Sequence, residues 1–111
     1  MANKQTYLGE FEHMVLLSIA SLKDDAYGVT IRQHLKDSID RDVTIGALYA
    51  TTERLEKKGF IETQLGGATA ERGGKAKRYM QVTASGAQAL QDTKAQLDMM
   101  WQKLASAGGV L

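Results

Sequence analysis

Apolar residues recur at helical spacing in the first part of the chain, in the segments Gly9–Leu22, Gly28–Ile39 and Thr44–Lys58. In each segment they fall three or four positions apart, so they share one face of a helix. The third segment also carries helix signals at both ends. Thr44 can cap its first turn, and Gly59 can adopt the left-handed backbone that often ends a helix. We therefore predict three amphipathic helices. On the third, we expect the inward face to consist of Leu48, Thr52 and Leu55.

The hydrophobic period changes from helical spacing to two after Gly59. Residues Phe60–Gln64 and Ala76–Val82 have the composition of short strands, and the stretch between them, Leu65–Lys75, contains four glycines. This order predicts an antiparallel hairpin with a long tip.

A last helical pattern begins at Thr83, which we expect to be its cap. Leu90, Leu97 and Leu104 repeat every seven residues, as in a short coiled coil. Such a stripe can pack back onto the same chain or against a second copy. A single long helix that follows a small core has little to cover it, so we favour self-association.

Three helices, a hairpin and a long helix, in this order, predict a winged helix-turn-helix with an added helix. The fold class is mainly α with a small β-hairpin. We expect residues 1–83 to form the winged-helix domain and residues 84–111 to form a dimerisation helix packed on that domain. The third helix is then the candidate recognition helix, and the hairpin is the candidate wing.

Composition narrows the class of protein. A chain of 111 residues with 43% hydrophobic and 24% charged residues is typical of one globular domain. The absence of cysteine excludes disulfides and thiolate metal sites. The N-terminal residues lack the apolar segment of a signal peptide, and no apolar run approaches the ~20 residues of a membrane span. We therefore expect a cytoplasmic protein without a membrane partner.

Charge is distributed unevenly, although the net charge is only +1. Residues 53–83 carry seven basic and four acidic side chains, whereas residues 1–52 carry five and seven. Basic residues at the hairpin can simply be solvated and prevent edge-to-edge pairing, or they can bind a polyanion. If Tyr79 points inward, alternation along the strand prevents Lys77 and Arg78 from both pointing outward.

Enzyme chemistry has no support in the sequence. His13 and His34 fall on different predicted helices and have no matching acids, and no phosphate-binding glycine loop is present. We expect no catalytic residue, no metal site and no cofactor.

Four stretches in order resemble the PadR family of bacterial transcriptional regulators. They are LGEFEHMVLLSIASL (8–22), DDAYGVTIRQHL (24–35), DVTIGALYATTERLEKKGFIE (42–62) and ERGGKAKRYMQVTASG (71–86). The resemblance implies a winged-helix, DNA-binding homodimer of the short subfamily, which has one long helix after the wing. The chain departs from the family in having no proline, and in carrying Thr52 where a leucine is usual.

Together, the patterns and the resemblance give a set of candidate DNA-binding residues. Small side chains on a recognition helix let it enter the major groove, and basic residues on the wing neutralise phosphates. The recognition-helix candidates are Thr44, Ala47, Tyr49, Ala50, Thr51 and Arg54. The wing candidates are Arg72, Gly73, Gly74, Lys75, Lys77 and Arg78.

The expected partners are double-stranded DNA carrying a palindromic operator, and a second copy of the chain. The expected dimer surface consists of Phe11, Met14, Val15, Ala87, Leu90, Leu97, Trp101 and Leu104. By resemblance, Met99, Met100 and Trp101 are also a candidate site for a small apolar effector, although packing within the dimer is the simpler role for them. We expect a repressor that an effector releases. The alternative is a winged-helix adaptor that binds protein and not DNA, for which a basic wing has no purpose.

Overall fold

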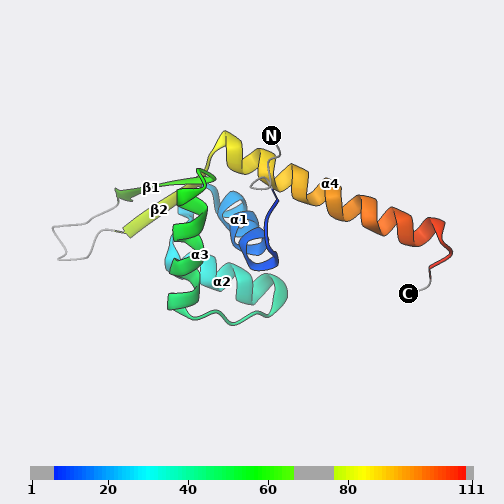
Figure 1. Cartoon of the computed structure of the whole chain (residues 1–111). Coiled ribbons are helices and arrows are strands. Elements are labelled where there is room, and N and C mark those ends of the chain that lie inside the picture. The colour runs from blue at the N-terminus through cyan, green and yellow to red at the C-terminus, as the bar shows by residue number, and fades with distance from the viewer. Residues whose placement is uncertain (1–6, 67–76, 110–111) are drawn as a thin grey trace.

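The computed structural model describes residues 7–66 and 77–109 and confirms the predicted order of elements. Helices α1, α2 and α3 form a bundle, and the hairpin and the far end of α4 project from it in opposite directions (Figure 1). The elements are α1 (Glu10–Leu22), the short 3-10 helix η2 (Lys23–Asp25), α2 (Gly28–Ile39), α3 (Ile45–Lys57), β1 (Ile61–Gly66), β2 (Lys77–Val82) and α4 (Ala84–Ser106).

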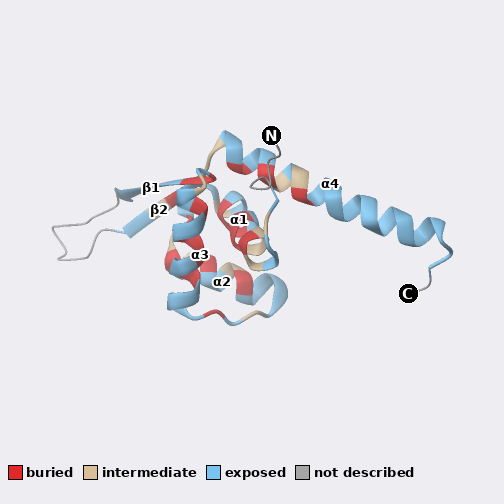
Figure 2. Cartoon of the chain, viewed as in Figure 1, coloured by how far each residue is buried: buried red, intermediate tan, exposed pale blue. Residues whose placement is uncertain are grey.

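The core lies between the three helices and the base of the hairpin, where the buried residues of Figure 2 gather. Leu48 and Leu55 of α3 have no exposed surface, and Thr52 is 6% exposed, so the predicted inward face is confirmed. Val15 of α1 also has no exposed surface. Our assignment of Val15 to a dimer surface was therefore wrong, because its side chain is already enclosed within its own chain.

The hairpin pairs in a single antiparallel register, from Ile61 opposite Val82 to Gly66 opposite Lys77. The first strand thus begins one residue later than the sequence predicted and ends two residues later, because its last residues find partners on β2. The hairpin is attached to the helices through Met80, which is 1% exposed and whose N–H donates to the Ala26 carbonyl at 2.9 Å.

Side chains alternate between the two faces of β2, and Met80 is the residue that points into the core. The assumption of an inward Tyr79 was wrong, since Met80 takes the inward place. Lys77 and Arg78 still lie on opposite faces of the strand, as alternation requires, and both are exposed. These two residues pair with the far end of β1, beyond the part of the hairpin that the helices cover.

Helix α4 packs on the bundle only along its first ten residues. Thr83 caps it by accepting a hydrogen bond from the Gly86 N–H at 3.0 Å. Gly86 lies so close to the hairpin that a Cβ there would be 2.1 Å from the Phe60 carbonyl oxygen. The last buried residue is Thr93, whose hydroxyl accepts the Leu8 N–H at 3.0 Å. Beyond it the helix extends away from the bundle, and all of its residues are exposed (Figure 2).

Candidate nucleic-acid interface

The exposed side of α3 is the first component of the candidate interface. The helix begins where the Thr44 hydroxyl accepts the Ala47 N–H at 3.1 Å, as predicted, and Gly59 follows its end with a φ of +80°. Because Leu48 and Leu55 anchor one side, the opposite side faces away from the bundle. Its central stripe, with a spacing of four, three and four residues, consists of Gly46, Ala50, Glu53 and Lys57, all exposed.

The structure places most of the predicted recognition-helix residues on the surface. Thr44, Ala47, Tyr49, Ala50 and Arg54 are exposed. Thr51 is not: it is 2% exposed, so its assignment to the outward face was wrong. One turn of helix separates Thr51 from Leu48 and Leu55, and this places it at the edge of their buried stripe. The sequence prediction also missed Glu53 and Lys57. Both lie on the side of the helix opposite the inward stripe, so helical periodicity could have placed them on the outer face.

Arg54 lies on the flank of α3 that faces α1, where it meets a buried acid. The Nε atom of Arg54 is 3.5 Å from Oε2 of Glu12, and the same oxygen accepts a hydrogen bond from Nζ of Lys58 at 2.9 Å. The other oxygen of Glu12 accepts the Gly9 N–H at 3.0 Å. The side chain of Glu12 is only 10% exposed. Arg54 is therefore held against α1 in the free chain, and also donates to the Thr51 hydroxyl.

Burial and hydrogen bonding act in opposite directions on this acid. Burial alone raises the pKa of Glu12, but the hydrogen bonds from Gly9 and Lys58 and the nearby cation of Arg54 favour the carboxylate, and the net result is a lowered pKa. Glu12 is thus ionised near neutral pH and fixes the end of α3 to the start of α1.

Tyr49 positions the start of α2 against α3. A Cβ on Gly28 would be 2.9 Å from the Tyr49 hydroxyl oxygen, so the absence of a side chain at Gly28 leaves room for the tyrosine. Tyr49 is still 46% exposed. It can therefore contact a ligand on the outer side while its ring rests on α2.

The second component is the basic end of the hairpin. Lys77 lies over the ring of Tyr27, with Nζ 4.5 Å from the ring centre, and Tyr27 meets Tyr79 edge-on at 5.3 Å. The hydrogen bond between Nζ and the Tyr27 hydroxyl raises the pKa of Lys77, so this cation persists at neutral pH. Arg78 lies on the other face of the strand, opposite Leu65. The remaining wing candidates, Arg72, Gly73, Gly74 and Lys75, lie outside the described residues.

Two hollows flank the hairpin and differ in character. One, of about 760 Å³, lies between the hairpin, α3 and the start of α2. Its lining includes exposed apolar side chains, two cations and two acids, which are Val29, Ile45, Tyr49, Leu65, Lys77, Arg78, Glu53 and Glu56. We call it the α3–wing groove.

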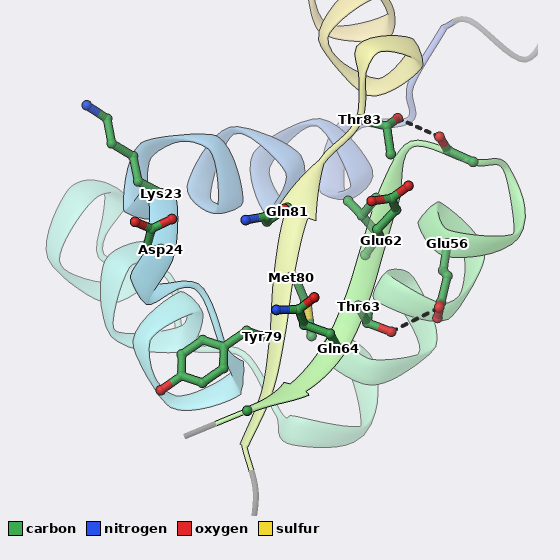
Figure 3. A pocket seen from close by; sticks show the side chains of 13 residues that line it. Lys23, Asp24, Glu56, Glu62, Thr63, Gln64, Tyr79, Met80, Gln81 and Thr83 are labelled. Carbon is green, nitrogen blue, oxygen red and sulfur yellow. Dashed lines mark hydrogen bonds between the residues drawn. The ribbon is translucent and has the colours of Figure 1, made fainter. Parts of the chain in front are cut away.

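The other hollow, of about 730 Å³, is drawn in Figure 3. The hairpin contributes the side chains of Glu62, Gln64, Tyr79 and Gln81 to this hollow. Thr63 donates a hydrogen bond to Glu56 beside them. Among the described residues, three carboxylates and one cation line it, which are those of Asp24, Glu56, Glu62 and Lys23. Acids outnumber cations in this hollow, whereas in the α3–wing groove two cations balance two acids. Because an acidic surface repels phosphate, the α3–wing groove is the better candidate for binding nucleic acid.

A comparison with protein-family models decides the family. Residues 16–92, more than two thirds of the chain, match the model of the transcriptional regulator PadR-like family. The chain belongs to the PadR-like family. A comparison with curated proteins found no match.

Solved structures agree with this assignment at the level of the fold. A PadR-like transcription factor from Bacteroides fragilis aligns with a TM-score of 0.76 and 22% identity, over 87% of this chain and 88% of that one. A PadR-like regulator from Bacillus cereus aligns at 0.71 and 21% identity, covering 91% and 93% of the two chains. A PadR family regulator from Clostridium difficile aligns at 0.70 and 19% identity, covering 89% and 99%.

PadR membership makes this chain a transcriptional regulator and not an enzyme, and it implies binding to DNA. Residues 7–66 and 77–109 contain no group of three His, Asp or Glu side chains placed to hold a metal ion. The same part of the chain has no helix of the length and apolar content needed to cross a membrane.

The free end of α4 is a second candidate surface of this PadR-like chain, separate from the nucleic-acid interface. Beyond Thr93 it exposes five large apolar side chains, none of which is buried by the described part of the chain. They are Leu97 (47% exposed), Met99 (62%), Met100 (66%), Trp101 (59%) and Leu104 (38%). Of the other predicted dimer residues, Ala87 is exposed, whereas Leu90, Phe11 and Met14 are half-buried against the core. The end of α4 therefore does not fold back onto the described part of its own chain.

Proposed function

We propose that this PadR-like regulator is a homodimeric repressor that binds a palindromic operator in double-stranded DNA. The observation that carries the proposal is the exposed side of α3, which begins with small uncharged residues and lies beside the cations of the hairpin. Gly46, Ala47 and Ala50 leave the helix backbone free to approach the floor of the major groove. Lys77 and Arg78 can meanwhile neutralise phosphates beside that groove.

The free end of α4 supports the dimer. Isolated apolar residues are common on protein surfaces, but five on one exposed half-helix form a patch that favours a partner. The repeat of Leu97 and Leu104 at seven residues favours a second helix of the same kind. A two-fold pair of chains presents two copies of α3 to two half-sites, which is why we expect a palindromic operator.

Residues Met99, Met100 and Trp101 support a finer proposal, which is an effector site between the two copies. Flexible thioethers and an aromatic ring suit a flat apolar molecule. Binding there would change the separation of the two α3 helices and release DNA. Saturable quenching of Trp101 fluorescence by a candidate effector tests this step, and quenching that never saturates would count against it.

The proposal as a whole is tested by selecting bound fragments from sheared genomic DNA at ~50 and ~200 mM salt. Wild type should enrich a palindromic site, and its affinity should fall steeply between the two salt concentrations. A Lys77→Ala/Arg78→Ala variant should bind more weakly, with a salt slope that is smaller by about one per lost phosphate contact. The matched control is Lys23→Ala/Lys103→Ala, which removes two cations from other surfaces.

The result that refutes DNA binding through this face is an equal loss of affinity in both double variants, or no enrichment by wild type. A reporter gene placed behind the selected operator then distinguishes repression from activation. Because a transcriptional regulator must reach DNA, we propose that it works in the cytoplasm.

A further inference from the structure

The outer stripe of α3 contains one acidic side chain, Glu53, between Ala50 and Lys57. Glu53 is exposed, and in the part of the chain that the structure describes no salt bridge neutralises it. The other acid near it, Glu56, lies on the flank of the helix and accepts a hydrogen bond from Thr63 at 3.0 Å. Glu53 is therefore the unpaired acid on the side of α3 that our proposed function turns toward DNA.

A carboxylate in a DNA interface is unfavourable unless it accepts a hydrogen bond, because phosphates repel it and docking removes its water. Glu53 lies eight residues from Ile45, or about 12 Å along the helix axis, a distance comparable with the width of the major groove. Glu53 is exposed on the outer stripe, so docking α3 in the groove as proposed turns this length of the helix toward the base edges, where the acid can find a donor. The groove edges offer only two kinds of N–H donor, the amino groups of cytosine and of adenine.

The two donors differ in what lies beside them. The adenine amino group has an acceptor on each side, its own N7 and the O4 of the paired thymine, and these repel a second carboxylate oxygen. The cytosine amino group has an acceptor on one side only, the O6 of the paired guanine, and a carbon–hydrogen group on the other. A carboxylate is thus satisfied by cytosine and opposed by adenine. Guanine and thymine present acceptors at the equivalent position, which a carboxylate cannot use.

From these observations we propose that Glu53 is a specificity-determining residue, which accepts a hydrogen bond from the amino group of one cytosine in each operator half-site. The inference rests on the proposed docking of α3 in the major groove and deepens it. Along the rest of the outer stripe, Gly46 and Ala50 have no polar side-chain atom, so they cannot read a base by hydrogen bonding. Glu53 and Lys57 are the stripe residues that can.

The surroundings of Glu53 should sharpen this preference. It borders the α3–wing groove together with Ile45 and Tyr49, both of which are exposed in the free chain. DNA that covers these apolar side chains also removes water from beside the carboxylate. A wrong base then leaves the acid without a partner in a poorly hydrated site, which costs more than the same mismatch in open solvent.

The test uses the full chain and the operator found by fragment selection, with each base pair of one half-site changed in turn. Wild type should have one position where replacing C·G by any other pair lowers affinity about tenfold or more. A cytosine analogue that lacks the 4-amino group should cause a similar loss. Glu53→Gln should move the preference at that position to adenine, which a side-chain amide contacts through two hydrogen bonds. Glu56→Gln is the control and should keep the wild-type preference.

Two outcomes would overturn the inference. If Glu53→Gln and Glu53→Ala raise affinity equally for every operator variant, the acid only repels phosphates and reads no base. If wild type binds no operator at all, the proposed function fails and this inference fails with it. Circular dichroism of each variant checks that the fold is intact, which the exposed position of Glu53 leads us to expect.

Discussion

Replacing Glu12 by glutamine should destabilise the chain, because this buried acid joins α1 to α3. Glutamine keeps the shape of the side chain and an oxygen that can accept the Gly9 N–H. It loses the negative charge that pairs with Lys58 at 2.9 Å and with Arg54 at 3.5 Å. The variant therefore distinguishes the contribution of the charge from that of the hydrogen bond to Gly9 at the start of α1.

The size of the expected loss in stability follows from how far the interacting side chains are exposed to water. The side chain of Glu12 is 10% exposed and that of Lys58 is 30% exposed, so their hydrogen bond is partly shielded from water. A charge-assisted hydrogen bond of this kind contributes about 1.5–3 kcal/mol. The side chain of Arg54 is 53% exposed and more distant, so it adds little. We expect Glu12→Gln to lower the free energy of unfolding by about 2 kcal/mol, or Tm by roughly 10 °C.

The stability lost in Glu12→Gln should depend on pH. The pKa of Glu12 is lowered in the folded chain, so its stabilisation is present above its ordinary pKa and disappears as pH falls through the lowered value. Urea unfolding followed by far-ultraviolet circular dichroism, at a fixed protein concentration, measures this at about pH 7 and about pH 3. Glu10→Gln is the control, because Glu10 is exposed and pairs with Arg41 at the surface. Equal stability of Glu12→Gln and wild type at pH 7, or a loss that persists undiminished at pH 3, would refute the reasoning.

Three further predictions concern contacts between elements. Gly86→Ala should lower the free energy of unfolding by about 2–3 kcal/mol or more, because its Cβ would be 2.1 Å from the backbone oxygen of Phe60; urea unfolding at wild-type stability would contradict this. Gly28→Ala should displace Tyr49, whose hydroxyl oxygen would be 2.9 Å from the new Cβ, and so change operator affinity with less than about 1 kcal/mol lost in stability. Adding Tyr49→Phe should restore part of that affinity, and no restoration would argue against the contact. Trp101→Ser should weaken the dimer about tenfold or more in sedimentation equilibrium with little change in helix content, since the side chain is 59% exposed in one chain.

Local sequence signals predicted most of the fold. The caps at Thr44 and Thr83 and the left-handed Gly59 lie where short-range chemistry placed them, because a hydroxyl or a missing Cβ acts on its own turn of backbone. The error at the end of β1 has the complementary cause. Leu65 belongs to a strand because Arg78 pairs with it, and pairing partners are not visible in a single stretch of sequence.

The candidate site was predicted less completely than the fold. Periodicity placed Tyr49 and Ala50 on the outer side of α3, and composition placed the cations on the hairpin. Periodicity wrongly placed Thr51 on the DNA-binding side of α3 and Val15 on the dimer surface. Both are buried, because the width of a buried stripe depends on how closely the neighbouring elements approach.

The sequence by itself determined the order of elements, their caps, the recognition-helix candidates and the resemblance to the PadR family, all of which rest on short-range patterns. Only the tertiary structure decided that Glu12 reaches Lys58 across 46 positions of sequence, and that the α4 stripe beyond Thr93 stays uncovered. Both depend on where whole helices lie relative to one another. That arrangement is fixed by packing between distant segments, which no local pattern records.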